Sequence, residues 1–382
     1  MTRSRRALRR TPRVVALLVA LVLVAVTARW LLSHPSRVPL EPPSTLGSGF
    51  SSGSSWYQVY FTQPRYPDNP ANHHGGIDTH LVALMDGART SIDVADYDFD
   101  LATVADAMAR AERRSVRVRM VTDTDTLEST APAVKAAFAT LEGAGIPIVD
   151  DRRGDIMHDK FTVVDGAWVE TGSWNYTDGD TYRLNNNMIV IHSRDLAADY
   201  TGEFEKMFVR HQFGPSKSTT NSHPSLTIDG SEPARVQACF APEGHCGDLL
   251  VGAVQAARHS IRFMAFSFTD DAIGRAMLAR AQAGISVQGV FETTGSGTVY
   301  SEYGPLKQAG LDVYTDGNPW SMHHKVIIVD DQIVAFGSSN FSQAADTSND
   351  ENLLIVDDPA LARAFTTEYD AVLAAARSPV RP

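Results

Sequence analysis

One sequence pattern occurs twice in this chain, and it constrains the fold more than any other feature. The copies run from 157 to 175 and from 322 to 340, and each reads His-x-Lys-x4-Asp-x6-Gly-Ser-x-Asn. Every residue of the second copy lies 165 positions after its counterpart, with the histidines at 158 and 323. Such a repeat predicts two similar structural units within one chain. The matched residues are His158, Lys160, Asp165, Gly172, Ser173 and Asn175, and then His323, Lys325, Asp330, Gly337, Ser338 and Asn340.

Each copy has the pattern of a β-hairpin. Phe161 to Val164 and Val326 to Val329 are runs of β-branched and aromatic residues, which is typical of buried strands. Asp165-Gly166 and Asp330-Asp331 follow them as turn signals. Side chains two positions apart on a strand share a face, so the histidine and lysine of each motif project together. The serine and asparagine do the same on the returning strand, and we expect all four side chains near one point.

These residue types suit chemistry on a phosphate ester. Lysine ammonium and asparagine amide groups donate hydrogen bonds to phosphate oxygens. Histidine acts as a nucleophile or carries a proton. Lysine is almost never fully buried without a partner, and a bound anion would provide one here.

The repeated motif resembles the signature of the phospholipase D superfamily, and the resemblance extends from about Trp56 to Ala376. It implies two α/β units that pack across a pseudo-two-fold axis and share one phosphodiesterase site, without metal or cofactor. One histidine attacks phosphorus to give a phosphohistidine, and the other protonates the leaving oxygen. The candidate catalytic residues are His158, Lys160, His323, Lys325, Asn175, Asn340 and Glu351.

A further polar residue follows each hairpin. In the family, a glutamate matching Glu351 bonds the far nitrogen of the motif histidine, and the first copy has Asn186 at this place. A carboxylate behind an imidazole raises its pKa, whereas an amide only fixes the tautomer. Expecting Glu351 behind His323 and Asn186 behind His158, we assign His158 as the nucleophile and His323 as the acid and base. The family habit agrees, and the reverse assignment stays open.

Other residues near the motifs have supporting roles. Asp165 and Asp330 lie at the turns, too far along the strand to touch phosphate, and we expect them to be structural. Ser173 and Ser338 either touch the phosphate or tie down the hairpin. The aromatic residues Trp174, Tyr176 and Trp320 either line the mouth of the site or belong to the core.

Alternating strand and helix patterns surround both motifs, which predicts an α/β fold. We expect strands at 58–61, 91–99, 116–121 and 146–149, and helices at 80–88, 101–111 and 134–141. The second half repeats them with strands at 236–240, 260–268, 285–291 and 311–314, and helices at 249–257, 272–281 and 303–309. The expected architecture is two tandem phospholipase D-like α/β/α sandwich repeats, at 56–212 and 235–378, joined by a linker at 213–234 and packed as a pseudo-dimer with one shared active site.

The N-terminal 33 residues are predicted to direct export. Six arginines precede the apolar run from Val14 to Ala28, which is short for a membrane span of about 20 residues. Both a signal peptide cleaved after Ala28 and an anchor extended by Trp30 to Leu32 fit the sequence. The arginines keep that end in the cytoplasm and place the body outside. Residues 34–55 are rich in Pro, Ser and Gly and are predicted to be a linker.

Charge narrows the substrate class. Residues 1–40 hold eight arginines and no acid, so the rest of the chain has 26 basic and 45 acidic residues, a net charge of −19. Such a body repels bulk polyanions, which disfavours non-specific nucleic-acid binding. The favoured function is a metal-independent phospholipase D that hydrolyses phospholipid headgroup esters at a membrane surface, as a monomer. The alternatives are an exported endonuclease, a cardiolipin synthase-like phosphatidyltransferase, and a non-catalytic module that binds anionic lipid.

The two cysteines, Cys239 and Cys246, are predicted to form a local disulfide in an exported body. A metal site with the nearby His245 lacks enough ligands. The pair His73-His74 is expected to lie in a solvated loop, because neighbouring side chains diverge. No metal site is predicted.

Overall fold

The computed structural model describes residues 52–53, 56–218, 223, 225–229 and 233–379. The predicted leader at 1–33 and nearly all of the predicted linker at 34–55 lie outside these residues. Within the described residues the strands form two eight-stranded sheets with equivalent strand orders and one two-stranded sheet. The predicted α/β fold built from a tandem repeat is therefore confirmed.

The first sheet has the strand order β1-β2-β9-β7-β6-β3-β4-β5. Strands β3, β4 and β5 are parallel, and the other neighbours are antiparallel. Its strands are β1 (Ser52–Gly53), β2 (Tyr57–Phe61), β3 (Ser91–Asp96), β4 (Arg117–Thr122), β5 (Ile148–Asp150), β6 (Lys160–Val164), β7 (Trp168–Gly172) and β9 (Asn187–His192).

The second sheet repeats this arrangement in the order β10-β11-β18-β17-β16-β12-β13-β14. The motif hairpin of each half, β6–β7 or β16–β17, therefore lies in the middle of its sheet. The strands are β10 (Leu226–Ile228), β11 (Ala234–Ala241), β12 (Ser260–Ala265), β13 (Ser286–Phe291), β14 (Asp312–Thr315), β16 (Lys325–Val329), β17 (Ile333–Gly337) and β18 (Glu351–Asp357).

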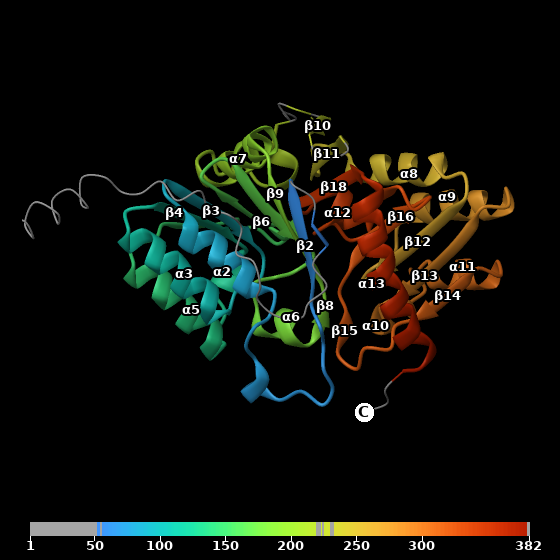
Figure 1. Cartoon of the computed structure of the whole chain (residues 1–382), viewed down its shortest axis with the longest axis horizontal. Coiled ribbons are helices and arrows are strands. Elements are labelled where there is room, and N and C mark those ends of the chain that lie inside the picture. The colour runs from blue at the N-terminus through green and yellow to red at the C-terminus, as the bar shows by residue number, and fades with distance from the viewer. Residues whose placement is uncertain (1–51, 54–55, 219–222, 224, 230–232, 380–382) are drawn as a thin grey trace, which may run out of the picture. The chain divides into compact units, whose positions relative to one another are not determined.

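Helices cover both faces of each sheet (Figure 1). Val164 of β6 faces a core under the outer helices of the first half, whereas its neighbour Val163 faces a central core. Alternation along the strand produces these two cores. The outer helices are α2 (Asp78–Gly87), α3 (Ala102–Arg113) and α5 (Pro132–Gly143) in the first half, and α8 (Cys246–Ala256), α9 (Asp271–Gln282) and α11 (Tyr303–Gln308) in the second.

The central core joins the two halves and contains the long helices α7 (Arg194–Phe208) and α13 (Pro359–Arg377). Phe161 and Tyr200 of the first half lie in it, as do Phe240 and Phe365 of the second. Buried apolar surface thus holds the two sheets together as one body. The short helices are α4 (Thr124–Leu127), α6 (Asp178–Tyr182), α10 (Thr293–Ser296) and α12 (Gln343–Thr347), with 3-10 turns η1 (Pro70–Asn72) and η2 (Gly214–Ser216).

Most predicted elements are present, and the larger differences lie in strand ends, in two long helices and in the linker. The strands expected at 91–99 and 260–268 end at Asp96 and Ala265, and loops follow them. Helices α7 and α13 were not predicted. The expected linker at 213–234 is not a simple linker, because it contains the turn η2 and the strand β10, which pairs with β11. Its Lys217 side chain is also buried and forms ion pairs with Glu203 and Asp350.

The glycine of each motif is required by a close approach of two strands. A Cβ on Gly172 would overlap the carbonyl oxygen of Asn187, and one on Gly337 would overlap that of Asn352. The predicted turns are also present, with positive φ at Asp165 and at Asp330. These features position the serine and asparagine that follow each glycine.

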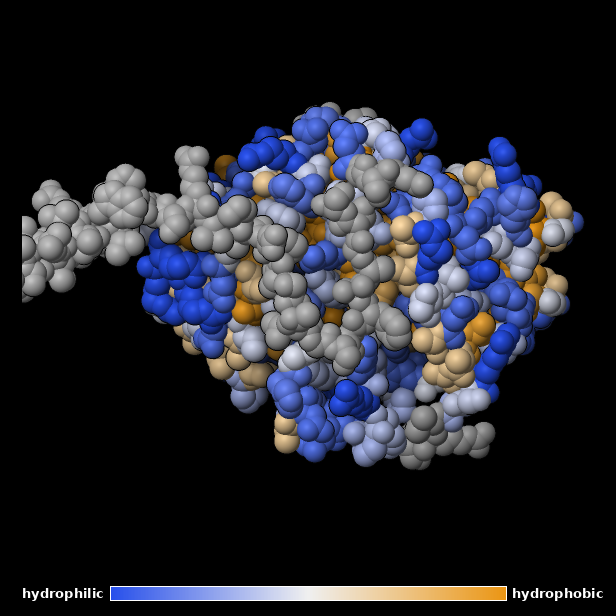
Figure 2. All heavy atoms as spheres, in the orientation of Figure 1, coloured by the Kyte–Doolittle hydropathy of each residue, from blue (hydrophilic) through white to orange (hydrophobic). Residues whose placement is uncertain are grey.

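The face seen in Figure 2 is mostly hydrophilic, and its apolar residues form small separate patches. This pattern is expected where amphipathic helices cover a sheet. Among the described residues, no helix combines the length and the apolar character that crossing a bilayer requires.

Candidate active site

The two motifs meet through reciprocal backbone contacts. The His158 N–H donates to the carbonyl oxygen of Asp350 at 2.9 Å, and the His323 N–H donates to that of Asn185 at 3.0 Å. Asp350 and Asn185 occupy equivalent positions in the two copies, 165 residues apart. A contact that recurs with its partners exchanged is the mark of two-fold symmetry. Each motif histidine therefore lies beside the segment that follows the hairpin of the other copy.

This crossing corrects the predicted pairing behind the histidines. The Nδ1–H of His158 donates to Glu351 at 2.7 Å, and the Nδ1–H of His323 donates to the Asn186 side-chain oxygen at 2.9 Å. The expectation that each histidine is held by its own copy was wrong. The short strand β15 (Ser321–Met322) pairs with β8 (Leu184–Asn185) of the other half, which carries the Asn186 segment to His323. With Glu351 behind His158 and Asn186 behind His323, the pairing does not identify His323 as the acid.

Both motif lysines are buried and are held in the same way. The Lys160 ammonium donates to the carbonyl oxygen of His158 at 2.8 Å, and the Lys325 ammonium donates to that of His323 at 2.7 Å. Each ammonium retains further hydrogens for a phosphate, since it carries three.

An aromatic ring lies against each histidine–lysine pair. The Tyr97 ring is 5.0 Å from the His158 ring and 5.1 Å from the Lys160 nitrogen. Phe266 lies 4.6 Å from the His323 ring and 4.5 Å from the Lys325 nitrogen. Sequence reasoning missed both rings because it placed them inside longer strands. The only sequence signal was their matched position after two equivalent strands.

The motif serines orient the residue behind each imidazole. Ser173 donates to the Asn186 oxygen at 2.8 Å, and Ser338 donates to the Glu351 carboxylate at 2.7 Å. Of the two possibilities left by the sequence, this geometry favours structural support over phosphate contact.

The side-chain amides of both motif asparagines have polar atoms that the protein leaves without a hydrogen-bond partner. The Asn175 amide nitrogen donates to Asp180 at 3.0 Å, which leaves one N–H for a ligand. Its amide oxygen is buried without a hydrogen-bond partner, and so is that of Asn340. Both side chains therefore retain hydrogen-bonding capacity.

The motif aspartates contact backbone near the turns. The Asp165 carboxylate accepts from the backbone N–H groups of Arg89, Thr90 and Ser91. Asp330 accepts from the three equivalent groups around the start of β12. These bonds hold the pKa of both carboxyls below the usual value against the opposing effect of burial. This placement is the structural one that the sequence predicted.

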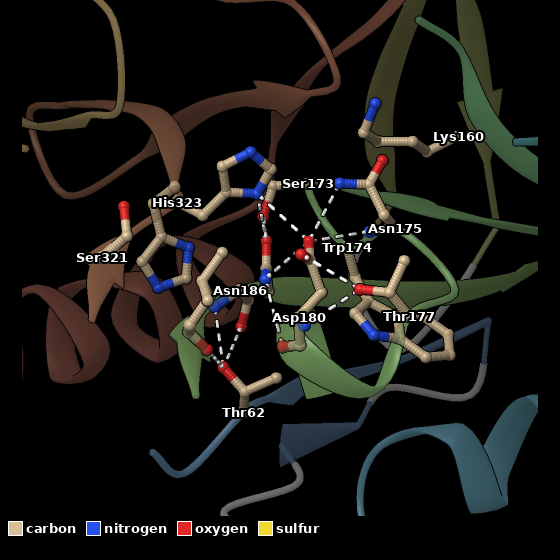
Figure 3. A network of polar contacts seen from close by, with 12 residues as sticks. Thr62, Lys160, Ser173, Trp174, Asn175, Thr177, Asp180, Asn186, Ser321 and His323 are labelled. Carbon is tan, nitrogen blue, oxygen red and sulfur yellow. Dashed lines mark hydrogen bonds and ion pairs between the residues drawn. The ribbon is translucent and has the colours of Figure 1, made fainter. Parts of the chain in front are cut away.

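Asp180 is a site residue that sequence reasoning missed. It lies on α6, and its carboxylate accepts from the side-chain amide of Asn186 at 3.2 Å and lies 3.4 Å from the His323 Nδ1. Figure 3 shows Asp180 between Asn175, Asn186 and His323. No motif marks it, because the equivalent residue of the second copy is Ala345.

Burial and neighbouring charges control protonation in the site. Burial, together with Lys160 and Lys325, lowers the pKa of His158 well below its usual value. Burial and Lys325 lower the pKa of His323 to about 3, while Asp180 opposes this shift. Burial raises the pKa of Glu351 to about 7. Burial also acts to raise the pKa of Asp180, but His323 and the hydrogen bonds to this carboxyl bring it below its usual value.

The remaining predicted residues divide between core and surface. Trp174 and Tyr176 are buried in the core of the first half, whereas Trp320 is 42% exposed and lies 5.9 Å from the Tyr66 ring. The disulfide between Cys239 and Cys246 is present as predicted. His73 is not simply solvated, since it bonds Asp68 at 2.6 Å and Asp178 at 2.8 Å. Among the described residues, no group of three or more His, Cys, Asp or Glu is arranged to hold a metal ion.

The geometry defines the class of site. In each imidazole Nδ1 is held from behind, so Nε2 is the nitrogen left for chemistry. Each lysine lowers the pKa of the histidine of the opposite copy, which shows that the two pairs share one electrostatic environment. Two imidazoles and two ammonium groups at one seam are able to hold an anion and to provide a nucleophile and a proton carrier.

Comparison with known proteins places the chain in a family. The sequence model described as cardiolipin synthase, PLD-like domain matches residues 81–208 and again 250–373. The chain therefore belongs to the phospholipase D family, as the repeated motif indicated.

Individual relatives agree. A Rickettsia prowazekii protein named phospholipase D is 32% identical over 157 residues, which is 40% of this chain and 77% of that protein. The human mitochondrial cardiolipin hydrolase is 33% identical over 164 residues, 42% of this chain and 65% of that protein. The structure of a Haemophilus influenzae phosphatidylserine synthase covers 77% of this chain and 83% of its own, with a TM-score of 0.58 and 12% identity, and supports the fold alone.

Proposed function

We propose that the protein is a phosphodiesterase that hydrolyses phospholipid headgroup esters through a phosphohistidine. The observation that carries this proposal is the meeting of two histidine–lysine pairs, one from each copy, with both Nδ1 atoms held from behind. Two relatives support the lipid substrate class through their names, phospholipase D and cardiolipin hydrolase. The acidic body supports it against a nucleic acid.

The reaction takes place in two balanced steps. In the first, Nε2 of His158 attacks phosphorus, the bond between phosphorus and the headgroup oxygen breaks, and His323 in its protonated form gives that oxygen a proton. In the second, His323 takes a proton from water, the water oxygen attacks phosphorus, and the bond between nitrogen and phosphorus breaks. The products are phosphatidate and the free alcohol. An alcohol in place of water would give a new diester.

The groups behind the two imidazoles support different roles for the two histidines. Glu351 has a pKa near 7 and holds the Nδ1–H of His158, which points the unprotonated Nε2 toward phosphorus. Asp180 has a pKa below its usual value, is ionised at neutral pH, and favours the protonated form of His323. The family resemblance also makes the first-copy histidine the nucleophile. We therefore keep His158 as nucleophile and His323 as acid and base.

Lys160, Lys325 and the two motif asparagines would hold the phosphate oxygens. The developing negative charge in the transition state would be stabilised by these preorganised donors. Nothing in this mechanism requires a metal ion, and a chelator tests that point.

We also propose that the catalytic body lies outside the cytoplasm, tethered by or released from its N-terminal segment. The arginine-flanked apolar run at 14–28 supports this, as does the disulfide between Cys239 and Cys246, because disulfides persist in oxidising compartments. Protease treatment of intact cells should remove the body if it is exposed, and protection equal to that of a cytoplasmic marker would refute the proposal.

The function is tested with protein lacking residues 1–33, incubated with phosphatidylcholine vesicles or with single- and double-stranded DNA in the presence of EDTA. We expect choline release in EDTA from the wild type and none from the His158→Asn variant. DNA cleavage with intact lipid would make the protein a nuclease. Binding of lipid without turnover would make it a non-catalytic module.

A further inference from the structure

The two copies keep their acidic residues at different places in the same framework. In the second copy, Ala345 lies on the short helix α12 that follows the hairpin, and Glu351 comes after this helix. The first copy has Asp180 and Asn186 at these two positions. One carboxylate is thus present in each copy, but it occupies a different position.

The two positions on the short helices are structurally equivalent. The side chain of Thr177 accepts from the backbone N–H of Asp180 at the start of α6, and that of Ser342 accepts from the N–H of Ala345 at the start of α12. The peptide N–H of the same two capping residues also donates to the carbonyl oxygen of Asn175 or Asn340. Backbone geometry is therefore shared, and the difference lies in the side chain.

The Asp180 carboxylate reaches the histidine that lacks a glutamate. The His323 Nδ1–H donates to the Asn186 oxygen at 2.9 Å, and the Asn186 amide donates to Asp180 at 3.2 Å. The same carboxylate lies 3.4 Å from the His323 Nδ1. Asp180 is only 7% exposed, so water screens this interaction weakly.

We propose that Asp180 is a positioning residue for His323 that supplies, from the short helix α6, the carboxylate that Asn186 lacks. This inference rests on the proposed two-histidine mechanism. Each catalytic imidazole then has one carboxylate behind it: Glu351 directly for His158, and Asp180 through Asn186 and at close range for His323. The asymmetric sequence preserves the charge balance of a symmetric site.

The test exchanges the carboxylate between the two positions. The Asp180→Ala/Asn186→Glu variant gives the first copy the arrangement of the second. Asp180→Ala alone removes the carboxylate, and Asn186→Glu alone places two carboxylates in contact. We expect each single change to lower kcat by about 10- to 100-fold, as for other residues that orient a catalytic ligand. The double variant should return to within about threefold of the wild type.

The leaving group distinguishes support of the acid from general damage. With phosphatidylcholine, the alcohol that leaves needs a proton, whereas p-nitrophenol from a phosphatidyl-p-nitrophenol leaves without much assistance. Asp180→Ala should therefore lose more activity on the first substrate than on the second, and its pH optimum should move to lower pH. Asp180→Asn, which keeps the shape of the side chain, should behave in the same way. Equal losses on both substrates would refute the role.

Ring NMR of 15N-histidine protein gives an answer without turnover. The His323→Asn variant assigns the His323 signals. We expect the Nδ1–H form of His323 in the wild type and in the double variant, and a mixture of tautomers in Asp180→Ala. An unchanged His323 spectrum in Asp180→Ala, or a double variant no better than its singles, would overturn the proposal. Absence of turnover in the wild type would refute the proposed function instead, and the spectra would still decide the role of Asp180.

Discussion

The two copies of the repeat share a backbone, but the groups that hold their two histidines differ in charge. Their hairpins, capped short helices and crossed contacts match residue by residue, yet His158 faces a glutamate and His323 faces an amide. An exact repeat would give two identical histidines, whereas the proposed reaction needs a nucleophile and an acid. The difference indicates that the repeated backbone positions the site, and that a few substitutions give its two histidines different surroundings.

The copies also differ in how their first helix is joined to the sheet. In the second, the disulfide links Cys239 on β11 to Cys246 on α8. In the first, strand pairing puts Tyr60 at the place of Cys239, and the Tyr60 ring stacks on His80 of α2 at 3.7 Å. Neither contact involves a motif residue, so we regard them as alternative means of bracing.

The largest expected effect comes from removing either histidine. His158→Asn and His323→Asn should each lower kcat/KM by at least about 10³-fold, because nucleophile and acid act on the same bond. The double variant should be no worse than the more damaged single, since the residues act as one unit. Unchanged circular dichroism serves as the folding control. A loss below about tenfold in either single would show that one copy works alone.

The next effect concerns the carboxylate behind His158. Glu351→Gln should lower kcat by about 10- to 100-fold, because the amide does not hold the imidazole in the same charge state. Glu368→Gln is the matched control: this glutamate bonds His324, the neighbour of the motif histidine, at 3.2 Å. We expect the control to stay within about twofold of the wild type. Equal losses of kcat in both variants would contradict the role of Glu351 in holding the His158 imidazole.

A smaller, pH-linked effect should accompany anion binding. Burial and the lysines hold the pKa of both histidines below the usual value, so both are neutral in the free site at pH 7. A bound phosphate attracts a proton, so binding should take up about one proton at this pH. Calorimetry with inorganic phosphate in buffers of different ionisation enthalpy measures it. Proton release, or the same uptake by the His323→Asn variant, would contradict the assignment.

The smallest effect on activity is expected from the bracing contacts. Cys239→Ser/Cys246→Ser should lower the free energy of unfolding by about 2–3 kcal/mol through the loss of a short loop closure. His80→Ala in the first copy should cost about 1 kcal/mol for the lost ring contact. Chemical denaturation measures both, and kcat should remain within about twofold. A large loss of activity in either variant would show that these contacts support the active site.

The candidate site residues and the local geometry of the two hairpins could be predicted from the sequence, because the motif is short and occurs twice. A two-residue spacing on a strand places the side chains of His158 and Lys160 on one face, whatever the rest of the chain does. The second copy then confirms the first. The disulfide was predictable for a similar reason, because its cysteines are only seven positions apart.

The crossing of the two copies was harder to predict because it depends on contacts between distant segments. His158 and Glu351 are separated by 193 residues, and no local pattern connects them. Asp180 was missed because comparison of the copies finds an alanine there. The missed helix α7 did carry a signal, since Leu196, Tyr200 and Phe204 follow a four-residue spacing and are all buried.

The most direct test of the central claim is to trap the phosphohistidine. From a substrate whose leaving group needs no proton, the His323→Asn variant should accept the phosphatidyl group and fail to release it, because it lacks the residue that activates water. After reaction with short-chain phosphatidyl-p-nitrophenol, an alkaline quench and peptide mass spectrometry, we expect the phosphatidyl adduct on His158. An adduct on His323 in the His158→Asn variant would reverse the roles. Lipid turnover by the wild type with no adduct in either variant would contradict the covalent mechanism.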